Sequence, residues 1–248
     1  MRRRDALVIG GFVAAAVALP PVLRRLPSEF EFSPVSGFDG FRRVRGGSVS
    51  SGNVALIGLD DRLPAPADPP LKALENPCLS LFGPQGWTQS RVPVAVFSDF
   101  NCPYCKTLDE RLVALETEGA PIRLVWHEMP LLGQGSYRSA RAAVAATFLG
   151  AGDAARAYLW HHNLPPGPAA LGRMAEALGL LPDMLRREFD SQRVINKLAL
   201  GLELGGRLGI PGTPGTVIGR TLVVGAIRPP DLDRLIRMEL EEGPLACT

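Results

Sequence analysis

Cys102 and Cys105 are the residues whose type and spacing most directly indicate chemistry. They follow an apolar run at 92–97 that predicts a buried strand, and a helical pattern begins directly after them. Unpaired N–H groups and the positive end of the dipole at a helix N-terminus stabilise a thiolate, the species that attacks disulfides. The motif therefore predicts a redox-active dithiol. We expect Cys102 to be the solvent-exposed attacking thiol and Cys105, one turn into the helix, to be the buried resolving thiol.

The helix after the cysteines has one apolar face at helical spacing. That face consists of Tyr104, Leu108, Leu112 and Leu115. The charged residues Lys106, Asp109, Glu110 and Arg111 are expected elsewhere on the helix. Pro103 suits the first helical position, because that position needs no N–H.

A second motif is the glycine- and proline-rich run at 209–219. Within it, Thr213 and Pro214 open a strand-like segment, where a proline is tolerated although it lacks an N–H. With both motifs the sequence resembles the DsbA-like disulfide oxidoreductases of the thioredoxin superfamily, over about 92–240. The matching stretches are 97–105, 128–133 with the helix-forming 139–143, and 209–214.

The resemblance implies an α/β chain with a thioredoxin fold and an inserted helical domain. It also implies that Pro214 is a cis-proline beside the cysteines and that Thr213 offers its backbone to an extended substrate. The dipeptide between the cysteines sets the redox poise. Here Tyr104 stands where the best-known oxidase of the family has a histidine, and Val96 replaces a buried acid of the family. Asp99 is the nearest carboxylate, and a role for it in proton transfer is as well supported as a role as a loop or cap residue.

Composition and pattern divide the chain into four parts. Residues 1–20 form an export signal or signal anchor, and 21–90 form an irregular extension with a proline-rich linker at 63–70, a strand at 54–57 and a basic, solvated turn at 42–45. Residues 91–135 and 209–242 form the thioredoxin-fold domain, and 136–208 form the helical insertion. Helices are expected at 136–148, 153–160, 171–178, 182–189 and 191–208.

The N-terminus has the pattern of a targeting segment, with three arginines at 2–4 followed by an apolar stretch at 6–19. The arginines resemble a twin-arginine signal, and residues 16–18 fit the pattern of a cleavage site. An uncleaved membrane anchor is the alternative. Both place the folded part in the periplasm, where disulfides persist.

Charge and histidine content exclude other classes of protein. Without residues 1–18 the chain has 24 basic and 24 acidic residues, so it offers no electrostatic footprint for nucleic acid. The three histidines, His127, His161 and His162, do not have the spacing of a metal site. We expect no cofactor.

Cys78 and Cys247 remain, either as a disulfide or as two unpaired thiols. The leading expectation is a monomeric protein-disulfide oxidoreductase that donates the Cys102–Cys105 disulfide to exported proteins and is reoxidised by a membrane redox partner. A periplasmic disulfide reductase or isomerase is the alternative within the same class. A protein of another class would bind a metal with all four cysteines.

Overall fold

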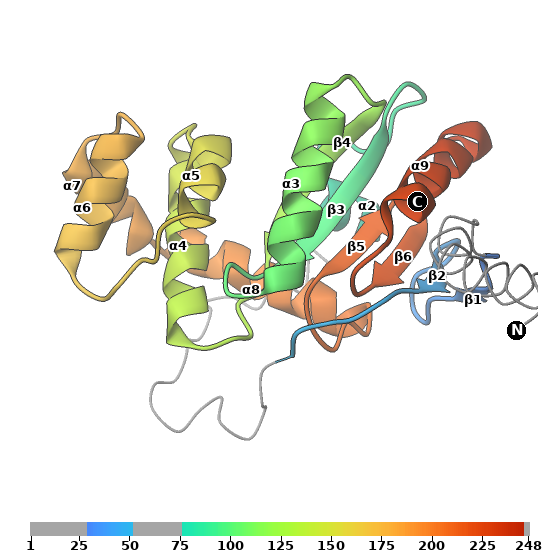
Figure 1. Ribbon diagram of the computed structural model, residues 1–248, viewed down its shortest axis with the longest axis horizontal. Helices are drawn as coiled ribbons and strands as arrows, with labels where there is room; N and C mark the ends of the chain where they lie inside the picture. The colour runs from blue at the N-terminus through green and yellow to red at the C-terminus, as the bar shows by residue number, and fades with distance from the viewer. Residues whose placement is uncertain (1–28, 52–75, 246–248) are drawn as a thin grey trace, which may run out of the picture.

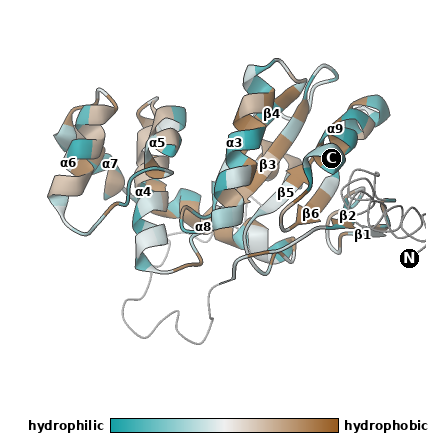
Figure 2. Cartoon of the chain, viewed as in Figure 1, coloured by the Kyte–Doolittle hydropathy of each residue, from teal (hydrophilic) through white to brown (hydrophobic). Residues whose placement is uncertain are grey.

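The computed structural model describes residues 29–51 and 76–245. Its centre is a sheet with the strand order β1-β2-β6-β5-β3-β4 (Figure 1). The strands are β1 (Phe32–Pro34), β2 (Arg42–Arg45), β3 (Val92–Ser98), β4 (Ile122–Glu128), β5 (Gly215–Ile218) and β6 (Thr221–Val224). The central strands are largely hydrophobic (Figure 2), as is typical of strands that are covered on both faces.

The strand pairing brings the two motifs together. Strand β3 leads through α3 (Pro103–Thr117) to the parallel strand β4, and β5 pairs with β3 in the antiparallel direction. In this register Phe97, near the end of β3, lies opposite Gly215, the first residue of β5. The residues that follow β3 and those that precede β5 therefore meet at one edge of the sheet.

Helices cover both faces of the sheet. Apolar residues of α3 and of α9 (Pro229–Glu242) pack on one face, including Leu112 and Leu235. On the other face lie α2 (Pro77–Phe82) and the second half of α8 (Gln192–Arg207), with Leu81 and Leu208 in the core. This arrangement confirms the predicted thioredoxin fold.

The helical insertion has a core of its own. It contains α4 (Gln134–Phe148), α5 (Gly152–Leu159), α6 (Pro168–Ala177), α7 (Pro182–Phe189) and the first half of α8. A run of small residues in α4 allows the neighbouring helices to approach closely. In Figure 1 these helices lie beside the sheet as a separate group. All five expected helices are present, with bounds that differ by at most three residues.

The prediction of a solvated turn at 42–45 is wrong. These residues form β2, which extends the sheet by pairing in parallel with β6. Arg42 binds Glu239 and Glu242 of α9 at 2.8 and 2.7 Å, and Arg43 donates to the carbonyl of Leu208. A charged strand lacks the apolar alternation from which strands are recognised, and the residues that bind its Arg42 and Arg43 side chains lie more than 160 positions away.

Several expectations fall outside the described residues. These are the export segment at 1–20, the strand at 54–57, the linker at 63–70 and Cys247. None of the helices in the described ranges combines the length and hydropathy needed to cross a bilayer.

Candidate functional site

Cys102 caps the N-terminus of α3, and Cys105 lies in its first turn. The sulfur of Cys102 accepts a hydrogen bond from the N–H of Cys105 at 3.2 Å. Pro103 occupies the first position of the helix. The first N–H groups of a helix have no partner within the helix, so this sulfur takes the place of an ordinary capping oxygen. The same N–H stabilises negative charge on the sulfur.

The loop before β5 forms the other wall of the site. The Thr213–Pro214 peptide bond is cis. The carbonyl oxygen of Thr213 lies 3.4 Å from the sulfur of Cys102 and can accept its thiol hydrogen. The structure thus brings together the four residues that the two sequence motifs singled out, Cys102, Cys105, Thr213 and Pro214.

The two thiols differ strongly in acidity. A hydrogen bond from the Cys105 thiol, followed by contacts with the hydroxyls of Ser50 and Thr213, lowers the pKa of Cys102 to about 6, although burial acts in the opposite direction. Burial raises the pKa of Cys105 far above that of an ordinary thiol, and the adjacent sulfur of Cys102 raises it further. At neutral pH Cys102 is therefore mainly a thiolate, and Cys105 keeps its proton.

The expectation that Cys102 is exposed to solvent is wrong. Its exposed fraction is 1%, and that of Cys105 is 0%. The spacing of residues in the sequence predicted that Cys102 lies at the helix end. It did not predict which segments pack around the sulfur. One of these comes from the N-terminal extension, where Ser50 pairs with Thr213 as an isolated β-bridge.

The other candidate tuning residues lie in different surroundings. Asp99 is buried just after β3, and its carboxylate accepts hydrogen bonds from the backbone N–H groups of Asn101, Leu131 and Leu132 at 2.7–2.9 Å. Asp99 thus connects the loop after β3 to the loop after β4. These contacts are those of a loop residue, which is one of the two roles that the sequence left open for it. Tyr104 is 42% exposed, so it faces solvent between the cysteines rather than the core.

A buried charge cluster beside the middle of α3 was not predicted from the sequence. Asp109, which was expected away from the buried face, is 1% exposed. Arg156 of α5 binds Asp109 at 2.6 Å and also binds Glu128 at the end of β4. The guanidinium lies over the ring of Trp126. An acid four residues after a buried cysteine lies on the same helix face as that cysteine, which is the signal that could have identified it.

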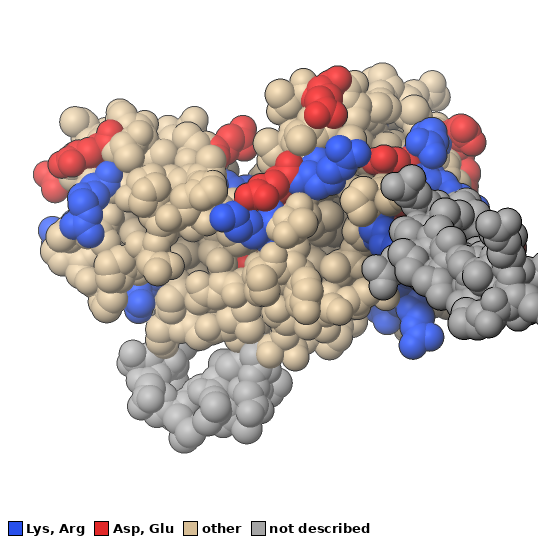
Figure 3. All heavy atoms as spheres, in the orientation of Figure 1, with Lys and Arg blue, Asp and Glu red and all other residues tan. Residues whose placement is uncertain are grey.

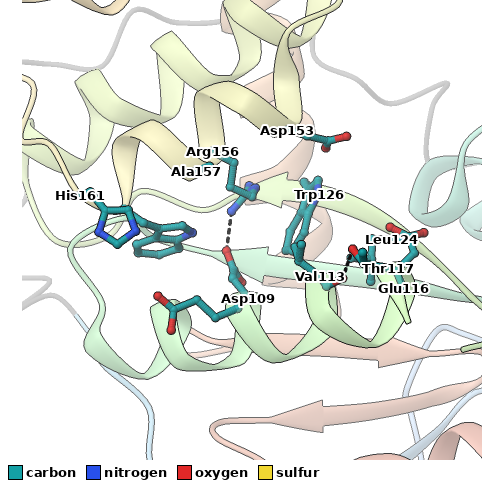
Figure 4. A pocket seen from close by; sticks show the side chains of 12 residues that line it. Asp109, Val113, Glu116, Thr117, Leu124, Trp126, Asp153, Arg156, Ala157 and His161 are labelled. Atoms are coloured by element: carbon teal, nitrogen blue, oxygen red, sulfur yellow. Dashed lines mark hydrogen bonds and ion pairs between the residues drawn. The ribbon is translucent and has the colours of Figure 1, made fainter. Parts of the chain in front are cut away.

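Figure 4 shows Asp109 and Arg156 of this cluster at a cleft of about 340 Å³ between α3, α5 and β4. Asp109 and Arg156 point toward one another, and Trp126 stands beside them. Neither cysteine lines the cleft, so it is separate from the dithiol. The cluster instead joins the active-site helix to the helical insertion.

Within residues 29–51 and 76–245, no three His, Cys, Asp or Glu side chains are grouped in a way that could bind a metal ion. Cys78 is part of a disulfide, so it offers no thiolate to a metal. His127 is buried, stacks on Phe97 and contacts the carbonyl of Leu81 at 2.9 Å. Burial lowers the pKa of His127 to about 3, so this imidazole stays neutral.

Comparison with solved structures finds the same fold. A thioredoxin-like oxidoreductase from Silicibacter pomeroyi is 30% identical, with a TM-score of 0.59, over 66% of this chain and 97% of that one. The thiol-disulfide exchange protein alpha-DsbA2 from Wolbachia pipientis is 25% identical, with a TM-score of 0.55, over 66% of this chain and 90% of that one.

Two curated relatives are much longer than this chain. Na(+)/H(+) antiporter NhaA 3 of Salinispora tropica is 30% identical over 132 residues, which are 52% of this chain and 20% of the antiporter. Na(+)/H(+) antiporter NhaA 1 of Salinispora arenicola is 29% identical over 64% of this chain and 24% of the antiporter. The chain thus spans about a fifth to a quarter of these relatives.

A family model described as a DSBA-like thioredoxin domain matches residues 93–237, which include both cysteines, the helical insertion and the cis-proline loop. Since this match covers more than half of the chain, the protein belongs to the DsbA-like family of thiol:disulfide oxidoreductases.

Proposed function

We propose that this protein acts in the periplasm and donates the Cys102–Cys105 disulfide to the thiols of exported proteins. The observation that carries the proposal is the contact between the sulfur of Cys102 and the N–H of Cys105 at the start of α3. It favours the thiolate of Cys102, and with it the reduced form of the pair. A disulfide whose reduced form is stabilised is a strong oxidant.

The proposed cycle begins with the oxidised pair. A substrate thiolate attacks the sulfur of Cys102, a new disulfide forms between substrate and Cys102, and Cys105 leaves with the bonding electrons. Cys105 then takes up a proton, as its raised pKa favours. A second substrate thiolate attacks the substrate sulfur of the mixed disulfide, and Cys102 leaves as a thiolate. The substrate has lost two electrons, and the protein has gained them.

The surroundings of the dithiol support an extended protein substrate. Figure 3 shows that the charged side chains on this face are scattered, and that an uncharged area lies over the lower end of α3. Such a surface suits unfolded chains of varied sequence, because it imposes no charge preference. A membrane redox partner would accept the two electrons and restore the disulfide.

The reduction potential of the Cys102–Cys105 pair tests the direction of electron flow. The protein is equilibrated in glutathione buffers, and the fraction of reduced pair is read from the mass added by alkylation. The double variant Cys102→Ser/Cys105→Ser gives the background from Cys78 and Cys247. We expect a potential above about −180 mV, as for oxidants and isomerases, whereas a value near about −270 mV would indicate a reductase.

A further inference from the structure

The segment Gly46–Ser51 follows β2 and runs along the end of the sheet to the dithiol site. Gly47 donates its N–H to the carbonyl of Ala226 at 2.8 Å, and Ala226 donates to the carbonyl of Ser48 at 2.9 Å. In Figure 1 the segment is the blue coil that leaves β2 and passes beneath β6 and β5. It therefore extends the pairing of β2 with β6 beyond the strands themselves.

Ser50 makes a two-way pair with Thr213. The N–H of Ser50 donates to the carbonyl of Thr213 at 2.7 Å, and the N–H of Thr213 donates to the carbonyl of Ser50 at 2.9 Å. This is the antiparallel pairing by which an extended peptide adds to an exposed strand edge. Since Pro214 has no N–H, Thr213 is the residue of this loop that can pair in both directions, and Ser50 already uses both of its groups.

Cys102 is adjacent to the paired residues Ser50 and Thr213. The Thr213 carbonyl that accepts from Ser50 is also 3.4 Å from the sulfur of Cys102. The hydroxyl of Ser50 helps to lower the pKa of Cys102. Ser50 thus occupies the place that a residue next to a substrate cysteine would occupy. With this segment in place, Cys102 is 1% exposed.

Glycines permit the segment to lie this close to the loop. A Cβ at Gly212 would come within 2.6 Å of the carbonyl oxygen of Ser50, and a Cβ at Gly47 within 2.5 Å of the carbonyl oxygen of Ala226. A side chain at either position would push the two backbones apart. Glycines therefore permit the close approach at two separate contacts, Gly212 with Ser50 and Gly47 with Ala226.

The segment is held by its backbone and not by a core. None of the residues from Gly46 to Ser51 is buried, and Val49 is the one apolar side chain among them. Segments with few buried apolar contacts open at low free energy. A peptide that offers the same hydrogen bonds can replace this segment without exposing an apolar core.

We propose that Gly46–Ser51 is a built-in occupant of the substrate edge, in which Ser50 takes the place of a substrate residue on Thr213. An incoming extended peptide displaces it before a substrate sulfur reaches Cys102. This inference rests on the proposed function, because it takes Thr213 as the docking residue for protein thiols. The segment therefore competes with peptides for the backbone of Thr213. It hinders small thiols less, because they need no pairing with Thr213.

Exchange rates with two thiols test the inference. The oxidised protein is mixed with a ten-residue peptide that contains one cysteine, or with dithiothreitol, and mixed disulfide or reduced protein is followed by mass. Ser50→Pro removes the donor to Thr213. We expect it to raise the ratio of peptide to dithiothreitol rate constants about tenfold, because the hydrogen bond from the N–H of residue 50 to Thr213 no longer opposes docking. Ser50→Ala is the matched control, since it loses the hydroxyl but keeps the N–H and so keeps the wild-type ratio.

Hydrogen exchange on the Cys105→Ser variant gives an independent answer that does not depend on Ser50→Pro folding well. The peptide is trapped on Cys102 as a mixed disulfide, and amide protection is compared before and after. We expect the Ser50 amide to lose its protection while the Thr213 amide keeps it, now bound to the peptide. An unchanged Ser50 amide in the trapped complex would overturn the inference.

The two possible failures can be told apart. A wild-type chain that exchanges with neither thiol would overturn the proposed function and the inference together. Normal exchange with both thiols, with an unchanged ratio in a folded Ser50→Pro variant, would overturn the inference alone.

Discussion

The carbonyl oxygen of Thr213 lies 3.4 Å from the sulfur of Cys102, although 111 positions separate the two residues. The sulfur is therefore placed between an N–H of α3 on one side and a backbone carbonyl on the other. The N–H favours the thiolate, whereas the carbonyl accepts a hydrogen bond only from the thiol. These two contacts come from distant parts of the chain, and they act on the acidity of Cys102 together with the larger effects of the Cys105 thiol and of burial.

Trapping experiments should identify Cys102 as the nucleophile. Cys105→Ser leaves the attacking thiol without a resolving partner, so mixed disulfides with substrate proteins should accumulate on Cys102. Cys102→Ser should accumulate few, because Cys105 is buried and keeps its proton at neutral pH. The alkylation rate of the reduced protein against pH should have its midpoint at about 6, the pKa of Cys102. Faster labelling of Cys105 at neutral pH would refute the assignment.

The reduced protein should be more stable than the oxidised protein near pH 8. The pKa of Cys102 is about 6 in the folded chain and that of a free thiol is about 8.5, so the folded reduced form binds fewer protons between these values. The thiolate therefore stabilises the reduced fold fully above about pH 8.5, and this contribution is lost as the pH falls through about 6. The cross-link itself closes a loop of four residues, so its opposing stabilisation of the oxidised form is at the low end for a disulfide and leaves a smaller net difference.

Thermal melts of the two redox forms between pH 5 and pH 8 measure this difference. We expect the melting temperature of the reduced form to exceed that of the oxidised form by a few degrees at pH 8, and the difference to shrink toward pH 5. An oxidised form that melts higher across the whole range would point to a reductase.

Replacement of Tyr104 by histidine should lower the pKa of Cys102 further. The side chain at this position is 42% exposed and belongs to the first turn of α3, which also holds Cys105. A protonated imidazole near the sulfur would favour the thiolate. Because solvent screens an exposed charge, we expect a decrease of about half a unit in the midpoint of alkylation. Tyr104→Phe, which adds no charge, should leave the midpoint where it is in the wild type.

The sequence was sufficient for the fold through its resemblance to the DsbA-like family, and for the helix end that holds Cys102 through local patterns. Apolar runs and helical periods marked β3 and the inserted helices to within three residues, and they also marked the start of α3. Contacts between distant segments left no such pattern. The pairing of Ser50 with Thr213 depends on backbone atoms in a glycine-serine stretch, which composition alone presents as a loop. Asp109 shares a helix face with Cys105, but the charge that balances it inside the protein, Arg156, lies 47 residues away in the sequence.

Asp99 should prove to be a structural residue and not a redox-tuning one. Its carboxylate accepts three backbone hydrogen bonds and is closed to solvent. Asp99→Ala leaves those N–H groups without partners, so we expect it to lower the free energy of unfolding by about 2–4 kcal/mol. The midpoint of Cys102 alkylation should stay at about 6. A stable Asp99→Ala protein with a shifted midpoint or slower proton uptake at Cys105 would instead support a role in tuning.

The buried cluster of Asp109, Glu128 and Arg156 should make the stability of the protein depend on pH. Burial raises the pKa of Asp109 to about 6 and that of Glu128 to about 7, and Arg156 limits both increases. An acid whose pKa is raised by folding binds protons more tightly in the folded chain. Its effect on stability therefore becomes more unfavourable as the pH rises from about 4 through about 7.

Arg156→Met removes the cation that faces both carboxylates. We expect a loss of about 3–5 kcal/mol in the free energy of unfolding at pH 8, because two buried acids then lack their partner. At pH 5 the loss should be smaller, since protonation removes the unpaired charge. Urea unfolding at the two pH values gives the comparison.

Arg207→Met, which breaks an exposed pair with Glu203 at 2.8 Å, should cost less than about 0.5 kcal/mol at both pH values. In the double variant Arg156→Met/Asp109→Asn one of the two acids is gone, so part of the lost stability should return at pH 8. An equal loss in Arg156→Met at both pH values would mean that the guanidinium acts through its packing on Trp126 and not through its charge.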